Sequence, residues 1–511
     1  MENNRTMIGI IDIGSNSIRL AIYETTSQGE YRLVNENKES ARLSEKITSD
    51  GVLEKRDILS IVPILVQFRD ICRVYGCQKI RVAATAAIRN ASNADQIVEL
   101  LTEKTDLQVE LLSGEQEAYF GFVGVVGGME MDDGFIIDIG GGSTEITLFR
   151  DRKLLRSISL PLGAVNAQLK FGDKDSWTTS EVEGLKSEIE RMLAGVRWVT
   201  AHPELPLIGL GGTIRTLGKL NQRKQKYPLR VAHHYKLERE SIESFADTLP
   251  YMPLEKRKRI DGLSKTRSDI IVPGTIILQM VFSHIGASHC LVSGTGIREG
   301  LLLDMLGIGV PSPSEVLPRQ TRSLLAFHNV APMAHFEQVS HFAKQLYDLM
   351  VDETEEPGTR KLITTAAMLY KIGSGIRYHQ YDKHTMYWLM NAPLGALNHR
   401  EVVLCGSIVD YVTNHGKRMG TSEYRSLLQE RDTELISKLG TLLELAIALD
   451  ISETQCIQSM NAKHEHGALL LKLKCRSQAY LETRQLEAAA KNFKKIWGIK
   501  LEWEIQNAST H

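Results

Sequence analysis

The sequence predicts an α/β protein with two duplicated lobes that face a cleft, followed by an all-α region and a small α/β module. Residues 10–22 (IIDIGSNSIRLAI) and 136–148 (IIDIGGGSTEITL) repeat one pattern, in which Asp12 aligns with Asp138. After each copy, strand-like and helix-like segments alternate, as they do in α/β domains. Beyond residue 308 the apolar residues follow helical spacing instead.

The first lobe is expected to start with a hairpin and to continue as alternating helices and strands. Its predicted elements are strands at 7–12 and 18–23, a helix at 54–76, a strand at 79–85, a helix at 93–104 and a strand at 109–113. The helix at 54–76 is predicted because Ile58, Ile61, Leu65 and Phe68 recur at helical spacing.

The order restarts at Phe135, so the repeat involves whole domains and not only a motif. The second lobe is predicted to contain a strand from 135, strands at 145–149 and 154–163, a helix at 179–198, a strand at 206–212 and a further helix. Glycines and acids in GVVGGMEMDDG place the boundary between the lobes near 125–134. Two similar α/β halves commonly hold a ligand in the cleft between them.

The prolines of GIGVPSPSEVLPRQ predict a second linker, and four helical segments follow it up to about residue 450. The last sixty residues predict a strand, a helix that ends at Gly498 and a closing strand. The expected domains are therefore 1–125 (first lobe), 126–308 (second lobe), 309–450 (helical domain) and 451–511 (small α/β module).

Composition fits a multidomain globular protein of 511 residues with a formal net charge of −1. The chain is not basic overall, as many nucleic-acid-binding proteins are, and none of its apolar runs approaches the length of a membrane span. Neither nucleic acid nor membrane is therefore expected as a partner. The six cysteines form no CxxC pair, and we expect Cys72 and Cys77, five residues apart in a helical stretch, to be small buried hydrophobic residues rather than zinc ligands or a disulfide. A cytoplasmic protein is the simplest expectation.

The glycine turns are typical of sites that hold phosphate. Glycines let the backbone approach a ligand closely, and consecutive N–H groups can form a nest for anionic oxygens. An aspartate at the end of the preceding strand, Asp12 or Asp138, can hold Mg²⁺ beside that nest. One such turn could be a plain β-hairpin, but a second copy and the glycine loops IGLGGTIR and SGTGIREG favour phosphate. The expected phosphate-binding residues are Gly14, Ser15, Asn16, Ser17, Gly140, Gly141, Gly142, Ser143, Gly211, Gly212 and Thr213.

No GxxxxGK[ST] loop is present, and the turns resemble the phosphate loops of the actin, sugar-kinase and heat-shock ATPase superfold, which is ribonuclease H-like. Seven segments resemble the exopolyphosphatase and guanosine pentaphosphate phosphohydrolase (Ppx/GppA) family in order and approximate spacing. They are DIGSNSIRL, AATAAIRNASN, LLSGEQEAYFGFVGV, IIDIGGGSTEI, GLGGTIRTL, RSDIIVPGTIIL and SGTGIREGLL. This resemblance is dense over residues 8–305.

The family resemblance implies a role for several residues. In SGEQEA it places the catalytic base on Glu117, although Gln116 stands where the family has a second glutamate and Glu115 is an alternative acid. It also implies that Asp138 and Glu145 hold the metal, together with Asp12 from the first turn.

Arg89 in TAAIRNASN matches a phosphate-contacting arginine of the family, and Asn16, Gly141 and Ser143 match phosphate-binding positions. The acids also have structural interpretations: Glu117 as an exposed residue at a helix start, Glu145 as a surface strand acid and Asp138 as a turn cap.

Other charged and polar residues are ambiguous. The basic runs NQRKQKYPLR and EKRKRIDGLSKTR could follow a polyanion or form solvated helix faces. The helical domain resembles the HD-phosphohydrolase-like domain of the family, with His335 at the first ligand position. Tyr370 and Lys371 replace the His-Asp pair, and a lysine there opposes cation binding. His384 and His399 are interpreted as structural histidines.

The expected function is that of an Mg²⁺-dependent exopolyphosphatase, which releases orthophosphate from the end of linear polyphosphate through a water activated by Glu117. Guanosine pentaphosphate is the alternative substrate, and a non-hydrolytic nucleotide-binding regulator is a further alternative. A monovalent cation is a further candidate cofactor, and the resemblance implies a homodimer. Because Glu145 aligns with Arg19, we expect the first turn to bind phosphate and the second to carry the metal.

Overall fold

The computed structural model of the chain describes residues 5–507 apart from 49, 173–174, 353, 355–356, 416–421 and 466. The chain divides into two compact units between Val316 and Leu317. Within the part of the chain that the structure describes, none of the helices combines the length and the apolar character of a membrane span.

The first unit contains two sheets, and the first of these has the strand order β3-β2-β1-β4-β5. Its strands are β1 (Thr6–Ile13), β2 (Ser17–Thr25), β3 (Tyr31–Ser40), β4 (Lys79–Ala84) and β5 (Val109–Leu111). β1 pairs antiparallel with β2 and parallel with β4. The hairpin β1–β2 thus places the first glycine turn at the carboxyl end of a central strand, the end at which α/β sheets bind ligands.

The second sheet repeats this order as β8-β7-β6-β9-β11, with β10 added at the far edge. Its strands are β6 (Gly134–Ile139), β7 (Thr144–Arg150), β8 (Lys153–Leu160), β9 (Leu207–Leu210), β10 (Lys236–Leu237) and β11 (Cys290–Val292). β6 is antiparallel to β7 and parallel to β9, as β1 is to β2 and β4. The predicted α/β class with two duplicated lobes is confirmed.

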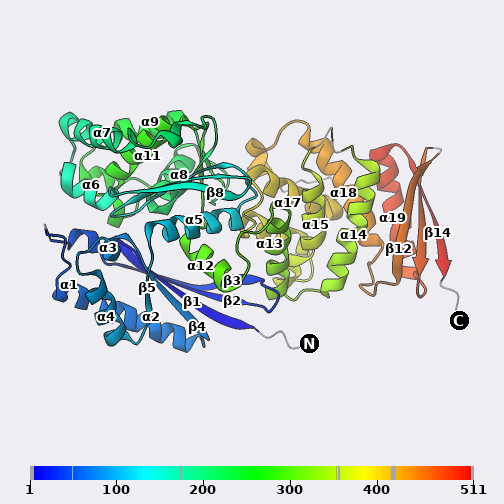
Figure 1. Cartoon of the computed structure of the whole chain (residues 1–511). Coiled ribbons are helices and arrows are strands. Elements are labelled where there is room, and N and C mark those ends of the chain that lie inside the picture. Colours follow the sequence, from blue (N-terminus) through cyan, green and yellow to red (C-terminus); the bar gives the residue numbers. More distant parts are fainter. Residues whose placement is uncertain are drawn as a thin grey trace. The chain divides into compact units, whose positions relative to one another are not determined.

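Helices cover these sheets, and each lobe has its own apolar core. In the first lobe they are α1 (Lys55–Leu59), α2 (Val62–Val74), α3 (Ala86–Arg89), α4 (Ala94–Thr105) and α5 (Gly114–Gly128). In the second lobe they are α6 (Ala164–Phe171), α7 (Thr179–Leu193), α8 (Gly211–Lys224), α9 (Arg239–Thr248), α10 (Leu254–Arg257), α11 (Ile271–Ile285) and α12 (Ile297–Met305). α5 and α12 lie between the two sheets (Figure 1).

Glycines allow α5 and α12 to pack backbone against backbone. A Cβ atom on Gly124 would lie 2.0 Å from the carbonyl oxygen of Gly296, and one on Gly300 would lie 1.9 Å from that of Phe120. Because larger residues cannot enter at these two positions, the axis of α5 is closely fixed between the lobes. This matters for the site because Glu117 lies in the first turn of α5.

Two segments differ from the expectations of the sequence. Residues 31–40 form an edge strand that was not predicted, because its polar side chains are mostly exposed and show no apolar alternation. The expected proline linker is largely helical: α13 (Pro313–Phe327) begins at Pro313 and contains Pro318. A proline at a helix start costs little, since the first N–H groups of a helix have no partner within it.

The second unit is helical and ends in a small sheet, which confirms the predicted helical domain and α/β module. After α13 its helices are α14 (Met333–Met350), α15 (Arg360–Leu369), α16 (Tyr381–Asn391), α17 (His399–Asn414), α18 (Asp432–Ala448) and α19 (Tyr480–Trp497). The three-stranded sheet has the order β12 (Ile457–Glu465), β13 (Ala468–Cys475), β14 (Lys500–Asn507).

His335 lies in the core of the helical domain, where both of its ring nitrogens are engaged. Nδ1 lies 2.8 Å from Oδ2 of Asp450, and Nε2 lies 2.7 Å from the hydroxyl of Tyr370. Lys371 pairs with Glu453. The first ligand position of the HD-like pattern is therefore part of a buried hydrogen-bonded chain, with a tyrosine hydroxyl on the nitrogen that a metal would otherwise bind.

All six cysteines are free thiols. Cys72 is buried, as predicted, and so are Cys290, Cys405, Cys456 and Cys475. Cys77 is only half-buried, contrary to the expectation, because it follows the end of α2 and lies near the lobe surface.

Candidate active site

Both glycine turns line one cavity of about 140 Å³ in the first unit. The predicted residues in its lining are Asp12, Gly14, Ser15, Asn16, Ser17, Glu117, Asp138, Gly140, Gly141, Ser143, Gly211, Gly212 and Thr213. Arg89, Gly142 and Glu145 lie just outside this lining. The fold therefore brings together residues from four separate segments of the sequence.

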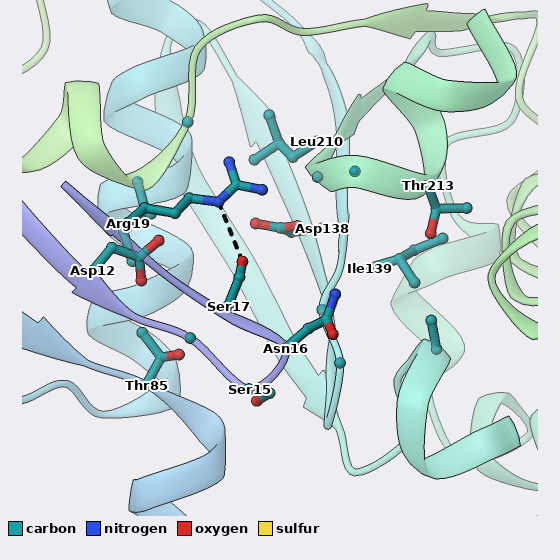
Figure 2. A pocket seen from close by; sticks show the side chains of 18 of the residues that line it. Asp12, Ser15, Asn16, Ser17, Arg19, Thr85, Asp138, Ile139, Leu210 and Thr213 are labelled. Atoms are coloured by element: carbon teal, nitrogen blue, oxygen red, sulfur yellow. Dashed lines mark hydrogen bonds between the residues drawn. The ribbon is translucent and has the colours of Figure 1, made fainter. Parts of the chain in front are cut away.

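The first turn is held by its carbonyl groups. The carbonyl of Asn16 accepts hydrogen bonds from the backbone N–H groups of Ala41 (3.1 Å) and Arg42 (3.0 Å), and that of Ser15 accepts one from Ser44 N–H (3.2 Å). Since the carbonyls face away, the side chains of the turn are presented to the cavity, as Figure 2 shows for Ser15 and Asn16.

The second turn has Gly141 and Gly142 where the first turn has Ser15 and Asn16, and the missing side chains allow the two turns to pack against each other. A Cβ on Gly141 would lie 3.0 Å from the Cβ of Ser15 and 3.2 Å from the backbone N of Asn16. One on Gly142 would lie 2.9 Å from the Ser44 hydroxyl. Gly142, predicted to bind phosphate, thus packs against the first lobe.

The third glycine loop opens α8 beside Asp138. Gly211 has a φ of 84°, a left-handed conformation that favours glycine, and a Cβ there would lie 2.8 Å from Oδ1 of Asp138. The free N–H groups and positive dipole end of α8 therefore point at the cavity, where they favour negative charge.

Glu117 and Arg89 form an ion pair at the edge of the cavity. Nη1 of Arg89 donates to Oε2 of Glu117 at 2.6 Å and to the carbonyl of Leu112 at 3.1 Å. Nη2 of Arg89 lies 4.0 Å from Oε1 of Glu145. Arg89 thus lies behind Glu117 and orients its carboxyl group, which itself lines the cavity.

The departure at Gln116 has a structural explanation. Its side-chain carbonyl accepts a hydrogen bond from the N–H of Ser113 (2.8 Å), and Ser113 Oγ accepts one from the N–H of Gln116 (3.1 Å). This is a capping box at the start of α5, which glutamine and glutamate form equally well. Glu115 lies on the opposite face of α5 and lines a separate cavity with Tyr119 and Phe122.

Glu145 is buried behind the second turn. Its Oε1 accepts hydrogen bonds from the hydroxyls of Ser143 (2.7 Å) and Ser159 (2.7 Å). In the β6–β7 hairpin it stands directly opposite Asp138. The corresponding pair in the β1–β2 hairpin is Asp12 and Arg19.

Burial shifts the ionisation of these acids. Burial and the nearby charge of Glu145 raise the pKa of Glu117 to about 8, against the opposing effect of Arg89. Burial and Glu145 likewise raise the pKa of Asp138 to about 7. Burial also raises the pKa of Asp12 and that of Glu145. Each of these carboxylates would be stabilised by a cation.

The carboxylates fit a hard cation such as Mg²⁺ in the way that this ion is usually held. Among the described residues, no group of three or more histidine, cysteine, aspartate or glutamate side chains is gathered closely enough to form a metal cage. Mg²⁺ commonly takes only one or two carboxylates and completes its octahedron with water and substrate phosphates. Asp138 and Asp12 line the cavity and would be such ligands, and Glu145 stands opposite Asp138 in the hairpin.

Four arginines in the cavity were not predicted as site residues: Arg19, Arg215, Arg267 and Arg298. Figure 2 shows Arg19 reaching from β2 toward Asp138, with its Nε 3.5 Å from Ser17 Oγ. Burial and the charges of neighbouring arginines, Arg19 among them, lower the pKa of Arg215 and that of Arg267 to about 10. Such mutual repulsion favours the binding of a polyanion.

All four arginines belong to motifs already noted in the sequence, so a signal was present. Arg19 aligns with Glu145, Arg215 closes GLGGTIR, Arg267 opens RSDIIVPG and Arg298 belongs to SGTGIREG. The guanidinium group of Arg267 packs directly against Gly212, where a Cβ would lie 1.9 Å from it, so only glycine leaves room for this arginine.

The sequence was then compared with known proteins. Residues 21–308 match the Ppx/GppA phosphatase family, and residues 319–492 match domain III of the Ppx/GppA phosphatases. The chain belongs to the Ppx/GppA phosphatase family. It is therefore a hydrolase, and its domain after residue 318 corresponds to the third domain of the family.

Curated relatives are distant. The chain is 26% identical over 398 residues to the guanosine-5'-triphosphate,3'-diphosphate pyrophosphatase of Pseudoalteromonas atlantica. This match covers 75% of each chain. It is 28% identical over 314 residues to a bifunctional 3-dehydroquinate synthase/phosphatase of Fusobacterium nucleatum. That match covers 59% of this chain but 47% of the relative, so the chain spans about half the length of that protein.

Solved structures support the actin-like lobes. A Ppx/GppA family member from Aquifex aeolicus is 29% identical, with a TM-score of 0.52 over 59% of this chain and 98% of that one. An exopolyphosphatase from Cytophaga hutchinsonii, 22% identical, shares the fold with a TM-score of 0.55 over 60% of this chain and 100% of that one.

Proposed function

We propose that this phosphatase hydrolyses the terminal phosphoanhydride bond of linear polyphosphate and releases orthophosphate. The observation that supports it best is the position of Glu117, whose carboxyl group lines a cavity built from two phosphate-type turns and four arginines. A binding protein for nucleotides has no use for a carboxylate with a raised pKa at this position, whereas a hydrolase needs a base there.

In this proposal Glu117 accepts the proton of the attacking water. Arg89 holds the carboxyl group in place through the 2.6 Å hydrogen bond, so that one oxygen stays directed at the cavity. The raised pKa, about 8, makes the carboxylate of Glu117, once ionised, a stronger base than that of an exposed glutamate. The water must then attack the terminal phosphorus in line with the leaving oxygen.

The two turns and the arginines bind the phosphate chain. The turns and the start of α8 line the cavity, and their backbone N–H groups that are not used within the hairpins can donate to non-bridging oxygens. Arg19, Arg215 and Arg267 supply the positive charge that stabilises the departing phosphate. When bound at Asp138 and Asp12, Mg²⁺ would neutralise further charge on the phosphate oxygens.

Guanosine pentaphosphate is the second candidate substrate. The named activity of the Pseudoalteromonas atlantica relative concerns such a nucleotide, and that match extends over three quarters of both chains. The same Glu117 chemistry would serve its 5'-terminal phosphate. The cavity described above recognises phosphates, a feature that both substrates share, so the choice between them needs a direct comparison.

The test is phosphate release from long-chain polyphosphate and from guanosine pentaphosphate by wild type, Glu117→Gln and Glu115→Gln, all at saturating Mg²⁺. We expect Glu117→Gln to lower kcat by about 100-fold or more, with KM little changed. Glu115→Gln is the matched control, because it removes a carboxylate two residues away on the opposite face of α5, and it should keep wild-type activity.

Wild-type turnover in Glu117→Gln would contradict the assignment of the base. A kcat/KM that favours guanosine pentaphosphate over polyphosphate would replace the proposed substrate with the nucleotide. Hydrolysis of neither compound by the wild-type chain would overturn both proposals in favour of a regulatory binding role.

A further inference from the structure

The end of α2 places two cysteines opposite each other. The N–H of Cys77 donates to the carbonyl of Cys72 at 2.9 Å, and the N–H of Gly76 donates to that of Arg73 at 3.0 Å. Gly76 has a φ of 66°. These features define a Schellman motif, in which the side chains at the positions of Cys72 and Cys77 face one another. The 2.9 Å backbone hydrogen bond between them keeps the two residues next to each other at the end of the helix.

The two sulfur atoms gather over one point on β1. A Cβ added to Gly9 would lie 2.6 Å from Sγ of Cys72 and 3.6 Å from Sγ of Cys77. Glycine at this position therefore leaves the space that both thiols share. Cys72 is fully buried, whereas Cys77 is half-buried and within reach of small solutes.

The two thiols also differ in acidity. The Cys72 thiol donates a hydrogen bond that lowers the pKa of Cys77, and the same interaction raises the pKa of Cys72. Burial instead raises the pKa of the isolated Cys290 to about 12. Because the thiolate is the reactive form, Cys77 is the thiol that would react first with an oxidant.

We propose that Cys72 and Cys77 are an oxidation-sensitive dithiol that closes into an intrachain disulfide when the folded protein meets hydrogen peroxide. The Cys77 thiolate attacks one peroxide oxygen, the O–O bond breaks, and Cys77 sulfenic acid forms, while the released hydroxide takes up the proton that Cys77 lost and becomes one water. The Cys72 sulfur then attacks the Cys77 sulfur, the S–O bond breaks, and the hydroxyl group of the sulfenic acid leaves with the Cys72 proton as a second water. One peroxide is reduced to two waters and two thiols are oxidised to one disulfide.

This modification site is independent of the proposed phosphatase chemistry. The two sulfurs lie between α2 and β1, beside Gly9, which precedes Asp12 by three residues on the same strand. The four remaining cysteines are buried, so peroxide has no comparable access to them.

The test uses the reduced, full-length protein treated with hydrogen peroxide, then alkylated and digested with trypsin. Cleavage after Arg73 separates Cys72 from Cys77, so a disulfide joins the peptides 70–73 and 74–79 into one species, lighter than their sum by two hydrogens. We expect this species to form at least about ten-fold faster than any oxidation product of Cys290.

Single variants identify the order of events. Cys72→Ser should accumulate a sulfenic acid on Cys77 that dimedone traps, whereas Cys77→Ser should leave Cys72 unmodified. Cys290→Ser, a buried cysteine without a partner thiol, should form the disulfide at the wild-type rate. The proposal is overturned if peroxide leaves the wild-type peptides unlinked, or if Cys72 is oxidised in Cys77→Ser as fast as it is in the wild type. The wild-type digest alone decides the matter if a variant fails to fold.

Discussion

The two glycine turns join equivalent hairpins, but the residue opposite the aspartate is positively charged in one and negatively charged in the other. In the β1–β2 hairpin Asp12 stands opposite Arg19, and in the β6–β7 hairpin Asp138 stands opposite Glu145. The first turn thus carries its own counter-ion, and the charge of Arg19 acts to lower the pKa of Asp12. In the second turn the charge of Glu145 raises the pKa of Asp138. One position of the duplicated hairpin therefore pairs an aspartate with an arginine in the first turn and with a second acid in the second turn, and we propose that this difference assigns phosphate to the first turn and the cation to the second.

The turns also differ in bulk, and the difference lets them form one site. Gly141 and Gly142 in the second turn occupy the space beside Ser15, Asn16 and Ser44 that any side chain would fill. Ser15 and Asn16 in the first turn supply polar side chains to the shared cavity. Duplication followed by loss of side chains in one copy thus produces a single asymmetric cavity.

The largest effect is expected from Glu145→Gln, which removes the acid that distinguishes the second turn. We expect the Mg²⁺-dependent kcat to fall by about 100-fold or more, because the second turn loses the negative charge of Glu145, which together with that of Asp138 attracts the cation. Ser159→Ala is the matched control, since it removes only one hydrogen bond to Glu145 and should cost much less. Steady-state phosphate release measures both variants, and equal losses in the two would argue against a role for the charge.

A smaller effect is expected from Arg19→Gln, the corresponding change in the first turn. KM for polyphosphate should rise by about ten-fold while kcat changes little, since one charged contact to phosphate is lost. The difference from wild type should shrink at high salt, which screens the remaining arginines as well. A fall in kcat with KM unchanged would show that Arg19 acts on the chemical step instead.

The raised pKa of Asp138 in the second turn should also make the stability of the metal-free protein depend on pH. An acid whose pKa rises from 3.8 to about 7 on folding contributes stability that is fully present below pH 4 and is lost as the pH rises through 7. The Tm in EDTA should therefore fall between about pH 4 and pH 7 and level off above, and Asp138→Asn should flatten this decline. Thermal unfolding of both proteins across this range measures it, and identical slopes would show that Asp138 is not the titrating group.

The smallest effect is expected from Gln116→Glu, which restores the acid pattern of the family. Because residue 116 serves the capping box with Ser113, glutamate should replace it with activity and Tm nearly unchanged. A large gain in kcat would assign position 116 a part in the reaction.

Sequence reasoning found the parts of the site that are encoded locally. The glycine turns, Asp12, Asp138 and Glu117 were recognisable because each lies in a short motif whose geometry depends on neighbours in the chain. The duplicated sheet order followed from the same repeat. Edge strand β3 was missed because strand pairing, and not its own polar sequence, makes it a strand.

The arginines were missed for a different reason. Arg19, Arg215, Arg267 and Arg298 converge only because parallel strands of two lobes end at one cavity, which no local pattern encodes. The burial of Glu145 behind Ser143 and Ser159 likewise depends on β8 lying beside β7. Convergence across lobes is a property of topology, so such residues emerge only from the folded chain.

The division of labour between the turns is tested most directly by titrating Mg²⁺ in the phosphate-release assay with Arg19→Gln and Glu145→Gln side by side. We predict that the Mg²⁺ concentration for half-maximal activity rises by about ten-fold or more in Glu145→Gln and stays at the wild-type value in Arg19→Gln. An unchanged Mg²⁺ requirement in Glu145→Gln, or an equal shift in both variants, would contradict it.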